Sequence, residues 1–518
     1  MRKLFITLCI LAVCIIIGII SLNYYFKTKI NEFLKEEVPS SVNVEYNELE
    51  INSWSGSIHL SNVSVVIHSQ NDSVPPSGFK SENLSVKDLS YWDYLVNKKI
   101  HFDKIVIDNN SFTYYKSKKQ DTTSKSQKKR IKLNKNIQLD LLEIGHSSIT
   151  ILDSEKDSLL LEIPNLTLLL KEIKTDENLI NRKMPIEFTK FNIQADSIFY
   201  RLNPYDNLRV ADFNLTDNSL KIKNASIQTK YSKAKLSQII PKERDHVNLD
   251  ISEINLNTFN WGFKEDLFFG KVDLINISQP TLNIYRDKLV TDDPTIKPLY
   301  SKMLRELPFN LMIDNISISN ANINYSEKVK ADQPAGEIEF NNLNAAIKNV
   351  GNTYKEGEKL TTLEIDATFM KQSPIHVNWN FDVQNKLDAF RFKSEVGRLS
   401  ADAMNSFTEP NLLVELSGEL KKSYFDISGN NNTSQINMKM DYDEFKIAVL
   451  NKKKKKNWLV STLANIFVSK DSDDQEGERF REGSGNATRD KTKSIFNYLW
   501  LSVKSGLITT MTGDGDKS

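Results

Sequence analysis

The chain contains little of the residue chemistry that supports covalent catalysis or metal binding. Its 518 residues include only two cysteines, Cys9 and Cys14, and both lie in one apolar segment near the amino terminus. The rest of the chain therefore has no disulfide, no thiol nucleophile and no thiolate ligand for a metal. Its stability must come from apolar burial and backbone hydrogen bonds.

Recognisable catalytic and metal-binding motifs are also missing. There is no G-x-S-x-G turn, no phosphate loop and no dinucleotide fingerprint. We predict that the protein is not an enzyme and has no catalytic residue, metal ligand or cofactor. An envelope hydrolase whose carboxylates converge only in the folded chain is kept as an alternative. The histidines occur singly, without metal-ligand spacing, at His59, His68, His101, His146, His246 and His376.

The chain lacks an excess of charge of either sign. It has 68 basic and 67 acidic residues, a net charge of +1. No long-range field therefore attracts nucleic acid, and neither an aromatic-basic RNA signature nor a helix-turn-helix pattern is present. We predict no nucleic-acid partner.

Only one long apolar run is present. Residues 4–22 carry no charge, and a helix of that length measures about 28 Å, close to the thickness of a bilayer core. Because Asn23, Tyr24 and Tyr25 follow instead of a small-residue cleavage site, we predict an uncleaved anchor with residues 1–3 in the cytoplasm. The predicted anchor residues are Leu4, Phe5, Ile10, Leu11, Ile15, Ile16, Ile19 and Leu22.

Most of the remaining chain alternates apolar and polar residues, which predicts β-strands. Five segments share a pattern of an alternating run, a break rich in Asn, Asp or Ser, and a second alternating run, which we interpret as strand, turn, strand. Their spacing is uneven, so no strict solenoid is expected. We predict a mostly β fold with an elongated, curled antiparallel sheet, a β-groove or solenoid-like arrangement. It comprises an N-terminal β region with a short helix over 23–115 and the β-groove body over 138–450. The five segments begin at Phe102, Leu139, Lys190, Lys271 and Phe309.

Two short helices are predicted, at 90–99 and 297–307. We expect the apolar faces of both to pack on the sheet. The apolar residues at helical spacing are Trp92 and Leu95 in the first helix, and Leu299, Tyr300, Met303, Leu304 and Leu307 in the second.

Two regions are rich in basic residues. Residues 116–137 carry nine basic residues and one acidic residue and are predicted to form a flexible loop, either solvated or near anionic headgroups. Residues 451–518 contain a lysine run, a polar loop and amphipathic helices. The last helix contacts a membrane or a partner, or packs on the sheet, and Gly506 is expected to loosen its end. The possible membrane-surface residues are Lys452, Lys453, Lys454, Lys455, Lys456, Trp458, Phe467, Phe496 and Trp500.

Several stretches resemble AsmA-like envelope proteins, which are related to bridge-like lipid-transfer proteins with repeating β-grooves. They are ELEINSWSGSIHLSNVSVVI with DLSYWDYLVNKKIHFDKIVIDNNSFTYY, the segment from KPLYSKMLREL to NAAIKNV, and the region from Asn378 through NYLWLSVKSGL. The high Asn, Lys and Ile content resembles members from Bacteroidota. The resemblance implies a single-pass inner (cytoplasmic) membrane protein with a periplasmic β-rich body that serves outer-membrane lipid balance or assembly. It supplies no catalytic residues.

A curled sheet with period-two patterning can line its inside with apolar side chains and keep its outside polar. Our hypothesis is that this lining binds phospholipid acyl chains or conducts them toward the outer membrane, without catalysis. The alternative is a scaffold or regulator of envelope assembly that acts on protein partners through strand edges. The sequence does not distinguish an open groove from a closed core filled by the protein's own side chains.

Overall fold

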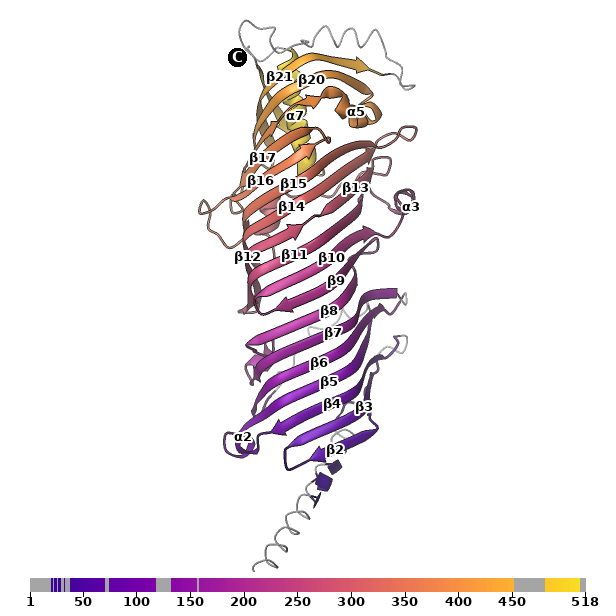
Figure 1. Ribbon diagram of the computed structural model, residues 1–518, viewed down its shortest axis with the longest axis vertical. Helices are drawn as coiled ribbons and strands as arrows, with labels where there is room; N and C mark the ends of the chain where they lie inside the picture. The colour runs from indigo at the N-terminus through magenta and orange to yellow at the C-terminus, as the bar shows by residue number, and fades with distance from the viewer. Residues whose placement is uncertain are drawn as a thin grey trace, which may run out of the picture. The chain divides into compact units, whose positions relative to one another are not determined.

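The computed structural model describes residues 20, 21, 23–25, 27, 28, 32, 38–69, 74–117, 132–155, 158–450 and 480–512. The chain forms two compact units (Figure 1). Unit 1 comprises Met1–Pro204 and Leu208–Ile222, and unit 2 comprises Tyr205–Asn207 and Lys223–Ser518.

The described elements of unit 1 are mostly strands, with the short helix α2 and the 3-10 turn η2. Strands β1 and β2 both pair with β3, and β3, β4 and β5 follow as antiparallel neighbours. The order continues through β6, β7 and β8. The elements are β1 (Val42–Glu45), β2 (Glu48–Asn52), β3 (Ser57–Ile67), β4 (Ser77–Leu89), α2 (Tyr91–Leu95), β5 (Lys99–Lys116), β6 (Asn136–Asp153), β7 (Ser158–Thr175), η2 (Leu179–Asn181) and β8 (Lys190–Arg201). Strands β9 (Asp206–Thr216) and β10 (Ser219–Thr229) are divided between the units.

Unit 2 continues with further strands and ends in a helix. Its strands pair in the order β11, β12, β14, β15, β16, β17, β18, β20, β21, β22, with β13 paired to β11 and β14, and β19 to β20. The elements are α3 (Lys233–Ile239), β11 (Asp245–Lys264), β12 (Leu267–Ser278), β13 (Thr281–Asp287), α4 (Tyr300–Arg305), β14 (Asn310–Lys328), β15 (Gly336–Gly351), β16 (Thr361–Phe369), β17 (Ser373–Phe381), β18 (Phe390–Val396), β19 (Leu399–Ser400), η3 (Ala401–Met404), α5 (Asn405–Leu412), β20 (Val414–Gly429), β21 (Thr433–Val449), β22 (Arg481–Thr488) and α7 (Ile495–Thr512).

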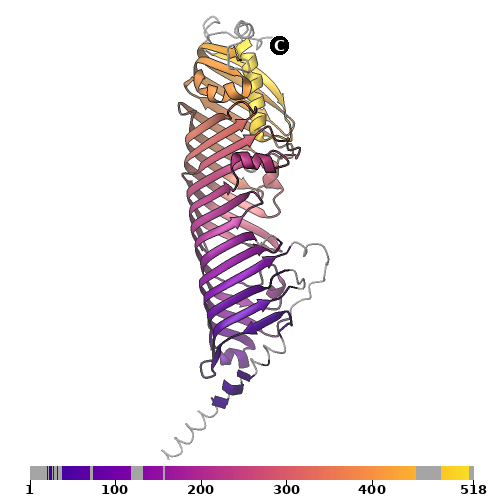
Figure 2. The ribbon, with the colours of Figure 1, turned by 90° about the vertical axis from the view of Figure 1, so that its right-hand side faces the viewer.

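The prediction of a mostly β fold with curled sheets is confirmed (Figure 2). The predicted antiparallel pairing holds for most neighbouring strands and fails at two places, because β6 pairs parallel to β5, and β14 pairs parallel to both β12 and β13. Parallel neighbours need a connection that returns along the whole strand. Between β13 and β14 this connection is residues 288–309, which carry α4.

The polar breaks in the repeated segments are mostly bulges inside long strands, not turns. Asn109 in β5, His146 in β6 and Asn320 in β14 have φ of 49°, 44° and 53°. The pairing register shifts at His146 and at Asn320. A bulge adds one residue to a strand, and Asn tolerates the left-handed conformation that it requires. Only the segment beginning at Lys271 divides, into β12 and β13, and both pair with β14.

The two short helices form, as α2 and α4. Leu299 at the start of α4 is buried, and the ring of Tyr300 lies 5.6 Å from that of Trp379. The expected packing of α2 is wrong, since Trp92 is 70% and Leu95 74% exposed. This happens because the contacts that hold α2 to the sheet are made by polar groups, described below.

The largest described core lies in unit 2, between α7 and the strands from β17 to β22. Its centre is more than 98% buried. Gly506 does not loosen the end of α7 as predicted, because it lies within the helix and a Cβ there would be 3.1 Å from Cγ2 of Ile436. The central residues are Ile427, Ile436, Met438, Met440, Tyr442 and Tyr498.

Several predictions concern parts of the chain outside the described residues. These are all eight anchor residues, most of the basic loop 116–137, and the membrane-surface residues from Lys452 to Phe467. Among the described residues, no helix has the length and apolar character needed to cross a bilayer.

Candidate functional site

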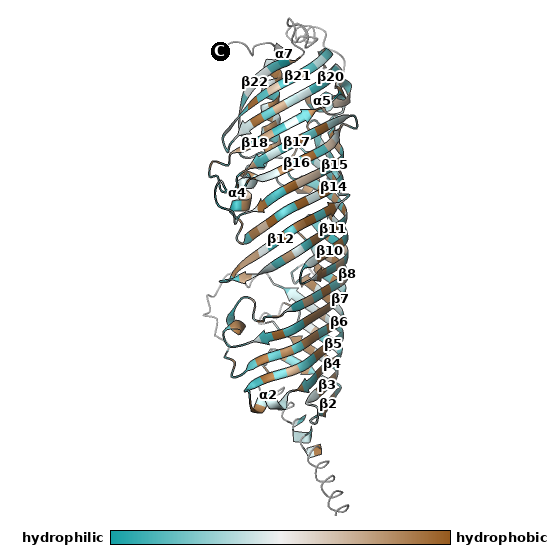
Figure 3. Ribbon diagram, turned by 60° about the vertical axis from the view of Figure 1, so that its left-hand side comes forward, coloured by the Kyte–Doolittle hydropathy of each residue, from teal (hydrophilic) through white to brown (hydrophobic). Residues whose placement is uncertain are grey.

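Unit 1 carries apolar side chains in register across neighbouring strands. Because residues paired across a sheet project from the same face, each set forms a row perpendicular to the strands. Figure 3 shows the alternation of hydrophobic and hydrophilic residues along the strands. One row is Ile58, Val86, Ile105, Leu142, Leu170 and Phe191, and the next is Leu60, Leu84, Ile107, Ile144, Leu168 and Ile193.

A small polar row follows where the strands bulge. Asn110 Nδ2 donates to Ser147 Oγ at 2.6 Å, and Ser81 Oγ donates to the carbonyl of Asp108 at 3.1 Å. The side chains of this row are buried and hydrogen-bonded, so they stabilise the bulges without offering a free polar group. Beyond them the apolar rows resume, with Phe79, Phe112, Ile149 and Ile163.

Unit 2 repeats this arrangement over more strands. Its rows lie on the face that α7 covers at one end. One row consists of Leu256, Ile275, Ile316, Ile347, Leu363, Trp379, Phe392, Ile427 and Ile436. A second contains Ile254, Ile277, Ile318, Ala345, Ile365 and Val377.

Burial changes along the first of these rows. Ile427 and Ile436 have no exposed surface, whereas Ile275 and Ile316 are only half-buried. The residues are of one kind and project from one face, so the difference arises from what covers them. The first row is therefore completely covered at Ile427 and Ile436 on β20 and β21, and half-buried from Leu256 on β11 to Ile347 on β15, although Ala345 in the second row is buried.

Helix α7 closes this end through direct contact with the backbone of β22. A Cβ at Gly483 would lie 2.2 Å from Thr510 Oγ1, and one at Gly485 would lie 2.3 Å from Ser505 Oγ. Glycine therefore permits the helix to approach this closely. The cavity left beside Leu299 and Trp379 measures about 10 Å³, far below the several hundred Å³ typical of ligand pockets.

The last predicted membrane-surface residues, Phe496 and Trp500, lie on the outward side of α7. They are 63% and 39% exposed, whereas Tyr498 and Leu499 belong to the core. The apolar residues of α7 thus occupy two sides of the helix. The side with Tyr498 and Leu499 packs on the sheet, which is one of the three predicted roles of this helix. Membrane contact of Phe496 and Trp500 stays a prediction.

The opposite, polar face of unit 2 has a broad depression of about 1010 Å³. Its charged groups pair with each other: Arg391 donates twice to Asp426, at 3.0 and 2.6 Å, and Lys439 pairs with Glu482. Since these charges are already neutralised locally, the depression offers no strong electrostatic attraction to a ligand.

In unit 1, one histidine lies among carboxylates. His101, Asp103 and Asp140 come within 4.8 Å of one another. Nδ1 of His101 lies 2.6 Å from Asp93 Oδ2, and Nε2 lies 3.0 Å from Asp140 Oδ1. Burial alone lowers the pKa of His101, but the hydrogen bonds with Asp93 and Asp140 outweigh it and raise the pKa above its ordinary value. Both ring nitrogens are hydrogen-bonded to carboxylates, which favours a structural role in which the ring holds a proton over a role as a metal ligand.

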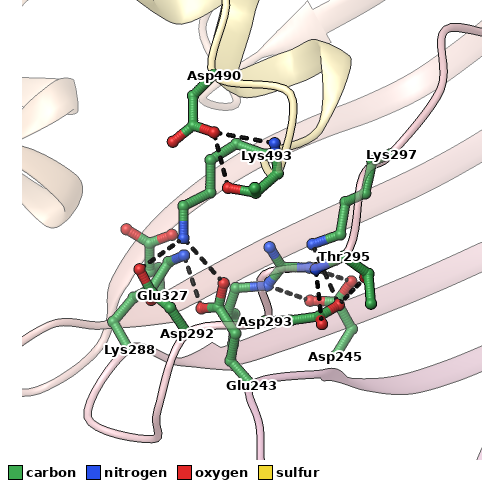
Figure 4. A network of polar contacts seen from close by, with 12 residues as sticks. Glu243, Asp245, Lys288, Asp292, Asp293, Thr295, Lys297, Glu327, Asp490 and Lys493 are labelled. Carbon is green, nitrogen blue, oxygen red and sulfur yellow. Dashed lines mark hydrogen bonds and ion pairs between the residues drawn. The ribbon is translucent and has the colours of Figure 1, made fainter.

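A polar network fastens the beginning of α7 to the sheet (Figure 4). Glu243, whose side chain is 1% exposed, accepts from Lys288 Nζ at 2.8 Å and from Lys493 Nζ at 3.1 Å. Lys493 also lies 3.0 Å from Asp292. Burial on its own raises the pKa of Glu243, but the two ammonium groups lower it below its usual value. Sequence reasoning missed this site because its residues are up to 250 positions apart.

No protein-family model matches the chain, and neither does any curated protein. The likeness to AsmA-like proteins therefore stays a prediction from the sequence.

Proposed function

We propose that this is a single-pass inner-membrane protein whose periplasmic body binds or conducts phospholipid acyl chains for outer-membrane lipid homeostasis, without catalysis. The observation that carries the proposal is the set of apolar rows in register, which on β3 to β7 and on β11 to β15 are half-buried except at buried Leu170 and Ala345. Monomeric soluble proteins rarely expose continuous apolar surface, and such surface usually marks a binding site.

The dimensions suit an acyl chain. Neighbouring strands lie about 4.8 Å apart, so a row across β3 to β8 extends about 24 Å. One leaflet of a bilayer core is about 15 Å thick. Each buried CH₂ contributes about 0.8 kcal/mol, so ten of them contribute about 8 kcal/mol before the costs of binding are subtracted.

The closed end limits where lipid can bind in unit 2. With Ile427 and Ile436 covered by the protein's own atoms, acyl chains would contact β11 to β15 and would not reach β22. Lipid that moves along this face must leave it before β17.

Photo-crosslinking in cells tests the proposal with neighbouring positions as controls. A benzophenone side chain at Leu168 or Ile316 is expected to capture phospholipid. The same group at Thr167 or Ser317, which are exposed on the opposite faces of the same strands, is expected to capture none. Equal capture at both members of a pair, or none at either, would contradict the proposal. Capture of one protein and never lipid would favour the assembly scaffold.

A further inference from the structure

Exposed apolar side chains lie on the turn between β2 and β3 and on α2 with the residue that follows it. Figure 1 shows these elements at one end of unit 1. Trp54 is 75% exposed, Trp92 70%, Leu95 74% and Val96 53%. Scattered apolar residues are normal on protein surfaces, but tryptophans gathered at one place are characteristic of binding surfaces. We call these four residues the end patch.

The residues of the end patch lie on two adjoining segments, because the turn that carries Trp54 is bonded to the segment that carries α2. The hydroxyl of Tyr91 donates to the carbonyl of Ser53 at 2.6 Å, and the backbone N–H of Leu89 donates to the carbonyl of Gly56 at 3.1 Å. Gly56 has φ of +71°, and a Cβ there would be 2.8 Å from Cβ of Leu89. The two segments therefore lie in direct contact.

Helix α2 turns its polar side toward the sheet and its apolar side outward. Ser90 caps the helix through Asp93 N at 3.2 Å, and Asp93 in turn bonds His101 at 2.6 Å. Lys135 Nζ donates to the carbonyl of Tyr94 at 3.1 Å and lies 3.2 Å from its ring centroid. A helix that packs on a core has the reverse orientation. Here the polar contacts fix the backbone so that the end patch projects away from the protein.

The position of Asn23 indicates what covers the end patch. Its Oδ1 accepts from the backbone N–H of Ser53 at 2.7 Å, the residue next to Trp54. The charge-free run 4–22 ends directly before Asn23. The residue that directly follows the bilayer-suited run is therefore hydrogen-bonded to the sequence neighbour of Trp54.

We propose that the end patch is a membrane-docking surface: Trp54, Trp92, Leu95 and Val96 enter the headgroup region of the bilayer that holds the anchor. Tryptophan prefers this interface, where its ring is apolar and its N–H remains solvated. Exposed Lys98, two residues beyond Val96, is placed to meet anionic headgroups. The inference rests on the membrane anchoring in the proposed function, and it is independent of acyl-chain binding.

The experiment uses the full chain with Cys9→Ala and Cys14→Ala, which leaves no other cysteine. A single cysteine at Trp54 or Trp92 carries an environment-sensitive fluorophore, and Leu387→Cys in unit 2, which is 69% exposed at the native residue, is the control. The protein is reconstituted into liposomes of phosphatidylethanolamine and phosphatidylglycerol, with or without brominated acyl chains.

We expect blue-shifted emission and several-fold stronger quenching by brominated lipid at positions 54 and 92 than at position 387. Emission at 54 and 92 that matches position 387 in protein that floats with the liposomes would overturn the docking surface and leave the anchor intact. Protein that fails to float would overturn both. Energy transfer between position-92 labels on different copies, without bromine quenching, would identify a second copy as the occupant and also overturn the inference.

Discussion

The covered and accessible parts of the apolar face in unit 2 can be distinguished by making the same substitution, isoleucine to alanine, at one position in each part. Ile436→Ala and Ile316→Ala remove the same three carbons from one row, the first under α7 and the second on β14. Three carbons correspond to about 2.4 kcal/mol of transfer free energy when fully buried. At Ile436, which has no exposed surface, an unfilled cavity adds to this, and we expect a loss of about 4 kcal/mol.

At half-buried Ile316 the expected loss is about 1 kcal/mol, because water already reaches the side chain and can fill the space left behind. Hydrogen exchange with mass spectrometry on the full chain measures the opening free energy of each region separately. Protection should fall strongly in α7 and β21 for Ile436→Ala, and only slightly in β14 for Ile316→Ala.

Equal losses at the two positions would refute the reasoning. A large loss at Ile316 would mean that the face on β14 is filled by the protein itself, and the proposed lipid site would disappear. A small loss at Ile436 would mean that α7 does not cover the row.

Three further predictions concern the contacts that hold α7 and α2. Gly485→Val should displace α7, because even a Cβ would lie 2.3 Å from Ser505 Oγ, and limited proteolysis should then cleave within 495–512 several-fold faster. Glu243→Gln leaves two ammonium groups without their shared carboxylate and should cost about 3 kcal/mol of α7 protection by hydrogen exchange, while Glu482→Gln, in an exposed pair, should cost less than about 1 kcal/mol. Because the pKa of His101 is higher in the folded chain, its contribution is complete below the unfolded pKa and is lost as pH rises through the folded pKa. Protection of α2, corrected for intrinsic exchange, should fall over that range, and His101→Gln should remove the dependence.

The sequence predicts the strands well, because each one alternates apolar and polar residues as a half-buried strand requires. It misleads at the bulges, where Asn109 and Asn320 look like turn residues. Asn favours the left-handed conformation equally in a turn and in a bulge, so composition does not distinguish the two. Only the pairing partner, dozens of residues away, shows that the strand continues.

The orientation of α2 could not be predicted from the local sequence pattern, for a different reason. Helical spacing groups Trp92 with Leu95, and an apolar group is expected to face a core. Asp93 is bound by His101 from β5, and Lys135 beyond the following connection binds Tyr94. His101 is eight residues from Asp93 and Lys135 is 41 residues from Tyr94, and neither lies within the helical pattern, so the reversal becomes apparent only in the folded chain.

The half-buried rows are difficult to explain by stability alone. Ile275 and Ile316 are half-buried, whereas Ile427 and Ile436 in the same row are completely covered. The fold can therefore cover such residues with a helix. Each 100 Å² of apolar surface left in water forgoes about 2.5 kcal/mol. Natural proteins accept that loss mainly where a surface must bind something. A row that is covered at one end and accessible at the other therefore fits our proposal of a ligand that is apolar and extended, as acyl chains are.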